Sequence, residues 1–203
     1  MTNLILPGLH GSGPDHWQSW WLSVDRDACL VKQDDWDTPR LDPWSGQVAA
    51  AVRSAPGAIL IAHSLGCALV ASIAVRHPAL PIGGALLVAP ADVEEAGWTS
   101  PGVAAFGPIS LGQFPFPAIV VASRNDPYVT FERSARFSAA WGAELIDLGY
   151  AGHINPLSGF GPWPLGLRLA EGLKHRGGFG ADRATHPSSG GIVTDALAFA
   201  SAL

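Results

Sequence analysis

Three polar residues that could act together in catalysis lie far apart in the chain. Ser64 lies in AHSLG, Asp126 in SRNDPYV and His153 in AGHIN. A serine hydroxyl is a weak nucleophile unless a base takes its proton, and the base must be oriented by a third group. A serine, a histidine and a carboxylate therefore suffice for attack on a carbonyl carbon, provided that the fold brings them together.

Each of the three also has a purely structural interpretation. Ser64 could be an ordinary turn residue, because a five-residue pattern such as this one often occurs by chance. Asp126 could make the turn ahead of Pro127. His153 could be a capping or hydrogen-bonded loop residue. Only their joint placement decides between these interpretations and catalysis.

Apolar runs and helical patterns alternate along the chain and predict the elements that would position these residues. The expected strands are Asn3–Leu6, Ala28–Lys32, Ala58–Ala62, Ala85–Ala89, Ala118–Ser123 and Glu144–Leu148. The expected helices are Asp15–Ser23, Pro43–Ser54, Leu65–Arg76, Phe131–Trp141 and Pro162–His175. Several strands lack polar alternation, which is typical of a parallel sheet covered on both faces. The pattern predicts an α/β fold with helices on both faces of the sheet.

Two of these helices have recognisable start signals. Asp42 is expected as an N-cap with Pro43 at the first helical position, and Thr130 is expected as the N-cap of the helix that begins at Phe131.

In such a fold, ligands bind at the carboxyl ends of the strands. Ser64 follows the third expected strand, Asp126 the fifth and His153 the sixth. All three are therefore expected at one edge of the sheet. Their chain order, Ser then Asp then His, is that of an α/β-hydrolase and differs from the orders in other serine hydrolases.

The residues around Ser64 fit the sharp strand-to-helix turn called a nucleophile elbow. Ala62 replaces the first glycine of the usual pattern and is small enough to be tolerated. The backbone N–H of Leu65 would lie at a helix N-terminus, where it could stabilise an oxyanion. The loop PGLHGSG after the first strand should supply a second donor, for which Leu9 is the candidate, and His10 in that loop is a candidate substrate contact.

The remaining reactive side chains give weaker signals. His63 is interpreted mainly as a packing residue, and the histidines elsewhere in the chain lack metal-ligand spacing, so no metal and no organic cofactor is expected. Cys67 should face the core one helical turn after Ser64. With Cys29 it is expected to be a reduced, buried thiol, because no CxxC spacing occurs.

Composition excludes several classes of protein. The 203 residues carry a net charge of −5 without a Lys/Arg cluster, so a nucleic-acid partner is not expected. The start MTNLILPGLHG lacks a signal-peptide pattern, and no apolar run reaches the roughly 18 residues of a membrane span. A cytoplasmic protein without a membrane partner is the expectation.

The domain organisation is simple. Residues 1–175 are expected to form one hydrolase domain, and residues 176–203 a linker and tail in which Ile192–Leu203 could form a short helix. The long Gly- and Pro-rich connection Pro90–Pro117 is a candidate cover for the site.

Four stretches resemble the small α/β-hydrolases of the retinoblastoma-binding protein 9-like serine hydrolase family. These are LPGLHGSGPDHWQSWW, AHSLGC, SRNDPYV and GHINPLSGFGPWPLG, within residues 3–174. The resemblance implies a minimal α/β-hydrolase with a six-stranded parallel sheet in the order 2-1-3-4-5-6, and a catalytic triad that falls on Ser64, Asp126 and His153. It also implies esterase-like activity.

The sequence thus predicts a serine hydrolase that cleaves small carboxylic esters or related acyl compounds through an acyl-enzyme, with a small-molecule or peptide-like substrate. The alternative is a noncatalytic protein-binding module on the same fold. The retinoblastoma pocket-binding pattern LxCxE is not fulfilled by Leu65–Leu69, which lacks the acidic residue and should be buried.

Overall fold

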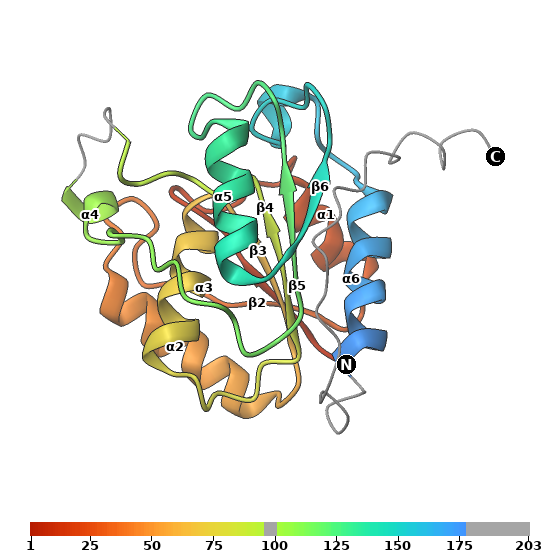
Figure 1. Cartoon of the computed structure of the whole chain (residues 1–203). Coiled ribbons are helices and arrows are strands. Elements are labelled where there is room, and N and C mark those ends of the chain that lie inside the picture. Colours follow the sequence, from red (N-terminus) through yellow and green to blue (C-terminus); the bar gives the residue numbers. More distant parts are fainter. Residues whose placement is uncertain (96–100, 178–203) are drawn as a thin grey trace, which may run out of the picture.

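A single parallel sheet forms the centre of the molecule (Figure 1). The computed structural model describes residues 1–95 and 101–177. The strands are β1 (Asn3–Leu6), β2 (Ala28–Leu30), β3 (Ile59–His63), β4 (Gly84–Val88), β5 (Ala118–Ala122) and β6 (Glu144–Asp147). They follow the order β2-β1-β3-β4-β5-β6, and all neighbouring pairs are parallel. The expected six-stranded α/β-hydrolase sheet is therefore confirmed.

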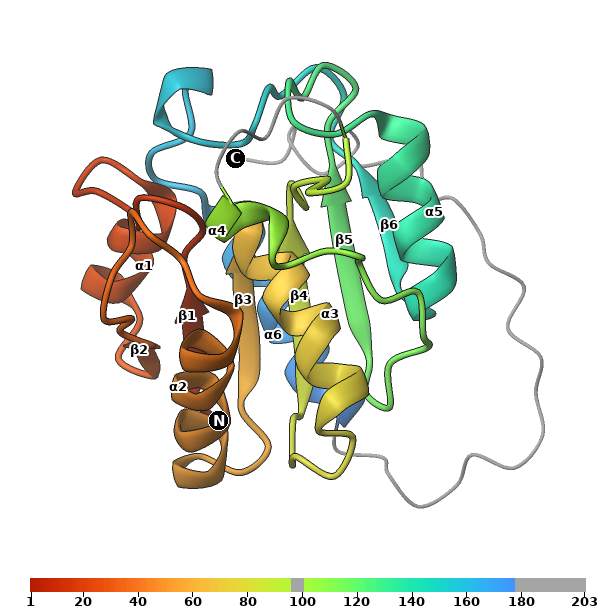
Figure 2. The same ribbon diagram turned by 90° about the vertical axis from the view of Figure 1, so that its left-hand side faces the viewer.

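Helices cover both faces of the sheet (Figures 1 and 2). The helices are α1 (Trp17–Val24), α2 (Leu41–Ser54), α3 (Leu65–Arg76), the short α4 (Pro101–Ala104), α5 (Phe131–Trp141) and α6 (Pro164–Gly177), with a 3-10 turn η1 (Pro156–Ser158). Side chains from α2, α3 and α5 pack in one hydrophobic cluster, and those from α1 and α6 pack in the other. The central strands β3, β4 and β5 are buried throughout, which explains why their sequences are apolar apart from His63 at the end of β3.

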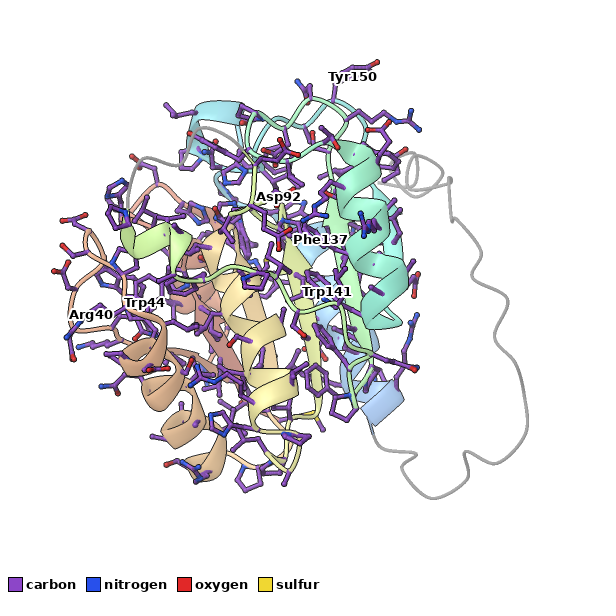
Figure 3. All side chains as sticks on the ribbon, turned by 60° about the vertical axis from the view of Figure 1, so that its left-hand side comes forward. Arg40, Trp44, Asp92, Phe137, Trp141 and Tyr150 are labelled. Atoms are coloured by element: carbon purple, nitrogen blue, oxygen red, sulfur yellow. The ribbon has the colours of Figure 1, made fainter. Side chains whose placement is uncertain are left out.

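Large aromatic side chains fill the space between sheet and helices. Trp17, Trp21, Trp44 and Trp141 are at most 2% exposed. Figure 3 shows Phe137 and Trp141 projecting from α5 toward the sheet, whereas Tyr150 points away from the molecule. Phe137 stacks on Trp141 with ring centroids 5.1 Å apart. Each buried indole removes a large apolar area from water, so these residues stabilise the layers that carry the site.

The predicted helix starts are partly right. Thr130 is the N-cap of α5, where its hydroxyl accepts from the N–H of Arg133 at 3.1 Å. Asp42 is not an N-cap, because α2 begins at Leu41 and Arg40 precedes it. Pro43 is tolerated in this first turn because its missing N–H would have had no partner within the helix. Asp42 instead pairs with Arg76 of α3 at 2.7 Å.

Other expectations also need correction. Cys67 is buried as expected, but Cys29 is exposed, because β2 is an edge strand of the sheet. Both thiols are free. The tail expected at 176–203 and its candidate helix Ile192–Leu203 lie outside the described residues, except that α6 continues to Gly177.

The described parts of the connection Pro90–Pro117, residues 90–95 and 101–117, pack mainly on the core. The connection contains α4, and its residues Val103, Phe106 and Ile109 are buried in the cluster of α2 and α3. Phe106 contacts Trp44 with ring centroids 5.6 Å apart. Asp92, close to its start, is buried and accepts from Nε of Arg133 on α5 at 2.6 Å. In its described part, the connection thus braces α2, α3 and α5.

Candidate active site

Ser64 lies in a strained turn between β3 and α3. Its backbone has φ 55° and ψ −120°, which is uncommon for a residue with a side chain and costs about 1–3 kcal/mol. The turn is held because the Ser64 N–H donates to the Val88 carbonyl at 3.0 Å. A residue of this conformation between a strand and a helix is typical of a nucleophile elbow, and Ser64 is 8% exposed.

The turn requires small residues where other backbone approaches it. A Cβ on Gly66 would lie 2.5 Å from the Leu6 carbonyl oxygen, and a Cβ on Gly8 would lie 2.9 Å from Cβ of Ser64. The loop after β1 therefore packs directly against the elbow. This contact brings the Leu9 backbone to the same side of the sheet as Ser64.

Asp126 and His153 form a hydrogen-bonded pair at the ends of β5 and β6. His153 Nδ1 lies 3.0 Å and 2.9 Å from the two carboxylate oxygens of Asp126. Because an ionised carboxylate only accepts hydrogen bonds, Nδ1 carries the proton and Nε2 is left as the acceptor. The Asp126 side chain is fully buried, and its orientation is fixed by the Tyr128 N–H at 2.9 Å.

Ser64 and His153 line one cavity of about 580 Å³, together with the loop after β1 and the segment after β6. Leu9 and His10 also line this cavity, whereas Leu65 lies behind Ser64 as the first residue of α3. The predicted residues therefore gather at one edge of the sheet. Their catalytic roles remain predictions.

His10 lies on the rim of the cavity. Its backbone is in the left-handed region with φ 64°, and its N–H donates to the Trp36 carbonyl at 2.9 Å. The ring is 70% exposed, and Nδ1 lies 2.8 Å from a carboxylate oxygen of Asp37. Access from solvent is compatible with the predicted contact to substrate.

Two further histidines in the cavity were not identified as site residues from the sequence. His16 and His63 line it, and their rings form a row with that of His153, with neighbouring ring centroids 4.8 Å apart. Burial, and next the nearby His153, lower the pKa of His16 to about 4 and that of His63 well below its usual value. Both rings are consequently neutral at neutral pH.

Other candidate reactive groups do not reach the cavity. Cys67 is completely buried, and burial raises the pKa of its thiol well above its usual value. In residues 1–95 and 101–177, no three His, Cys, Asp or Glu side chains are grouped as metal ligands. The Leu65–Leu69 stretch is buried, as expected, and is not available to a partner protein.

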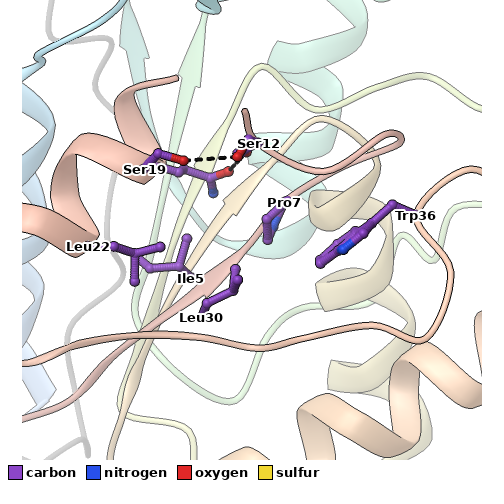
Figure 4. A pocket seen from close by; sticks show the side chains of 8 residues that line it. Ile5, Pro7, Ser12, Ser19, Leu22, Leu30 and Trp36 are labelled. Carbon is purple, nitrogen blue, oxygen red and sulfur yellow. Dashed lines mark hydrogen bonds between the residues drawn. The ribbon is translucent and has the colours of Figure 1, made fainter. Parts of the chain in front are cut away.

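A second, smaller cavity of about 90 Å³ lies beside β1 (Figure 4). It is lined by Ile5, Pro7, Ser12, Gln18, Ser19, Leu22, Leu30 and Trp36. Its polar groups bond to each other: Ser19 donates to the Ser12 carbonyl at 2.9 Å, and Ser12 donates to Gln18 at 2.6 Å. None of its lining residues carries a charge, so the larger cavity is the candidate active site.

Comparison with known proteins identifies the family of this chain. Residues 3–171 match the profile of a family described as serine hydrolase. The chain belongs to the serine hydrolase family. A search of curated proteins found no match.

Solved structures of similar proteins share the fold of this hydrolase, and the first of them also supports the family assignment. A YdeN-like hydrolase from Pectobacterium atrosepticum is 33% identical, with a TM-score of 0.75 over 87% of this chain and 91% of that one. The ydeN product of Bacillus subtilis is 22% identical, with a TM-score of 0.69 over 85% and 98%. A Bacillus cereus carboxylesterase, at 16% identity and a TM-score of 0.56 over 86% and 87%, shares the fold.

Among the residues that the structure describes, no helix is both long enough and apolar enough to cross a membrane.

Proposed function

We propose that this hydrolase cleaves small carboxylic esters, or related acyl compounds, through an acyl-enzyme formed on Ser64. His153 takes the proton from the Ser64 hydroxyl as the oxygen attacks the carbonyl carbon, and then donates it to the leaving group. Water, activated in the same way, attacks the acyl carbon and releases the acid with regeneration of Ser64. Asp126 holds the His153 tautomer and stabilises the imidazolium that forms in both steps.

The observation that carries this proposal is the buried Asp126–His153 pair beside the strained Ser64 turn at one cavity. The carboxylate fixes the proton on Nδ1, so Nε2 is the ring nitrogen left to act as a base. The Ser64 backbone keeps an unfavourable conformation that its surroundings enforce, and such conformations cluster at active sites.

The oxyanion would be held by the backbone N–H groups of Leu65 and Leu9. Leu65 N is at the N-terminus of α3, where the helix dipole favours negative charge. Leu9 follows Gly8, which contacts the elbow directly. Removing one such donor typically costs about 3–4 kcal/mol of transition-state stabilisation.

Substrate size follows from the shape of the cavity. The lining contains exposed apolar side chains such as Leu157, at 98% exposure, and the half-exposed Tyr128. No described residue of the Pro90–Pro117 connection lines the cavity. A short acyl chain or a peptide-like segment would fit such an accessible site.

The test is steady-state and pre-steady-state hydrolysis of p-nitrophenyl acetate and butyrate. We expect an initial burst of nitrophenol, because acylation releases it before deacylation limits turnover. Ser64→Ala should abolish the burst, and Asp126→Asn should lower kcat by about 10⁴-fold. Ser45→Ala, which changes a buried serine of α2, is the matched control and should leave activity unchanged.

Hydrolysis that survives Ser64→Ala at the rate of the unsubstituted chain would overturn the proposal. Absence of hydrolysis with every ester, in a folded protein, would favour the noncatalytic binding module.

A further inference from the structure

The segment that carries His153 is itself strained. Ile154, the next residue, has φ 49°, although a β-branched side chain rarely adopts the left-handed region. Ile154 is completely buried. A backbone of this kind is stable only where its surroundings hold it in place, and such positions cluster at functional sites.

Two buried side chains donate to consecutive carbonyl groups of this segment. His63 Nε2 lies 2.9 Å from the His153 carbonyl oxygen, and Trp17 Nε1 lies 2.9 Å from that of Ile154. Because a carbonyl oxygen only accepts, Nε2 of His63 carries the proton. Trp17 is completely buried and His63 is 6% exposed, so water competes little for these bonds.

The N–H groups of the same segment are held from another side. The Ala151 N–H donates to Ser123 Oγ at 3.0 Å, that of Gly152 to Asn125 Oδ1 at 2.8 Å, and that of His153 to Ser158 Oγ at 3.1 Å. The strained segment is therefore fixed at both its donors and its acceptors. The bonds from His63 and Trp17 hold the carbonyl groups of His153 and Ile154 in this segment.

His63 also connects the two reactive residues directly. It precedes Ser64 in the chain, and its side chain bonds the backbone of His153. Its ring packs against those of His153 and Trp17, with centroids 4.8 Å and 5.9 Å away. The distance between the serine and the histidine base is thus constrained through one buried contact.

We propose that His63 and Trp17 are positioning residues that hold the strained His153–Ile154 backbone, and thereby the His153 ring, in register with Ser64. This inference rests on the proposed function. Neither side chain takes part in proton transfer. They act through the two backbone carbonyls, so their loss should lower kcat while KM changes little.

The first test compares His63→Phe with His63→Gln. Phenylalanine keeps an aromatic ring but has no N–H, whereas the glutamine amide can place a donor where Nε2 of histidine lies. We expect His63→Phe to lower kcat, and the rate of fluorophosphonate labelling of Ser64, by about tenfold to a hundredfold, the range that a small misplacement produces. His63→Gln should restore most of the loss.

The second test compares Trp17→Phe with Trp21→Phe. Both changes truncate a completely buried indole of α1, but the Trp21 indole N–H has no partner in the described part of the chain. Similar losses of Tm are expected for the two variants, because similar apolar area is removed. Only Trp17→Phe should also lower kcat by about tenfold or more.

The outcomes separate this inference from the proposed function. If the unsubstituted chain is labelled, but His63→Phe and Trp17→Phe react at its rate, the positioning role is wrong and the proposed function stands. The positioning role would also be wrong if kcat fell equally in His63→Phe and His63→Gln, or equally in Trp17→Phe and Trp21→Phe. An unsubstituted chain that is neither labelled nor active would overturn both.

Discussion

At the scale of single residues, two neutral histidines form a row with His153, in which His63 is its neighbour and His16 lies beyond His63. Burial is the main cause that lowers the pKa of His16 and His63, and the neighbouring His153 lowers both further. A charge on either ring would lie close to the imidazolium that the proposed mechanism forms on His153 and would disfavour it. Keeping both rings neutral therefore suits a general base at this position.

The pKa of His16, lowered to about 4, predicts a pH dependence of stability. Between pH 6.5 and pH 4 the unfolded chain binds a proton at His16 that the folded protein does not. The free energy of unfolding should therefore fall as the pH drops through this window, by about 3 kcal/mol from His16 alone. His63 contributes in the same direction.

Urea unfolding between pH 7.5 and pH 4 measures this effect. His16→Asn keeps an N-cap acceptor for the Gln18 N–H, so it should fold and lose less stability on acidification than the unsubstituted chain. His175→Asn, at an exposed position of α6, is the control and should follow the unsubstituted chain. If the free energy of unfolding fell equally with pH in all three proteins, the loss of stability could not be attributed to His16.

At the scale of elements, the site depends on the close approach of the β1–α1 loop to the β3–α3 elbow. Gly8 contacts Ser64, and Gly66 contacts the Leu6 carbonyl, so the two segments touch with no room for a methyl group. In the proposed mechanism, this contact would bring the Leu9 N–H to the oxyanion. The Gln18 side chain also joins the two segments, because its Nε2 donates to the Leu6 carbonyl at 3.3 Å and to the Ile61 carbonyl at 3.0 Å.

Gly8→Ala tests this packing. The added methyl group must displace either the loop or the elbow, so we expect a loss of about 1–3 kcal/mol in the free energy of unfolding, together with a lower kcat. Gly46→Ala, in α2, adds a methyl group that meets no atom within 4 Å and does not line the cavity. It should leave kcat unchanged, and equal kcat for both variants would contradict the account.

Much of the element arrangement could be predicted from the sequence because local signals agree with the fold. Thr130 and the apolar run of β5 identify their elements directly. The start of α2 was missed because Asp42 and Pro43 fit an N-cap and a first position as well as they fit a first turn. The exposure of Cys29 depends on the edge position of β2, which local sequence does not encode.

At the scale of the whole molecule, the topology of the sheet brings residues that are distant in the sequence to one edge of it. The net charge of −5 determines the sign of the electrostatic field around the molecule. Strand order and chain order suffice to place Ser64, Asp126 and His153 together. The role of His16, His63 and Trp17 could not be predicted, because it depends on which helix face meets which carbonyl after packing. Such contacts leave no periodic signal in the sequence.

The charge distribution predicts discrimination against anionic substrates. Asp15 lines the cavity, and none of the residues described around it is a lysine or an arginine. We expect kcat/KM for p-nitrophenyl butyrate to exceed that for the p-nitrophenyl monoester of succinic acid by roughly tenfold at low salt. The ratio should shrink with added salt and in Asp15→Asn. A preference for the anionic ester would contradict this prediction.

The central claim is that Ser64 is a nucleophile activated by His153. The most direct measurement is fluorophosphonate labelling of the full chain, followed by mass spectrometry of the modified peptide, alongside Ser64→Ala and His153→Ala. The account predicts one phosphonylated residue, Ser64, with no labelling of Ser64→Ala and at most traces in His153→Ala. Labelling at another residue, or equal labelling of His153→Ala, would contradict it.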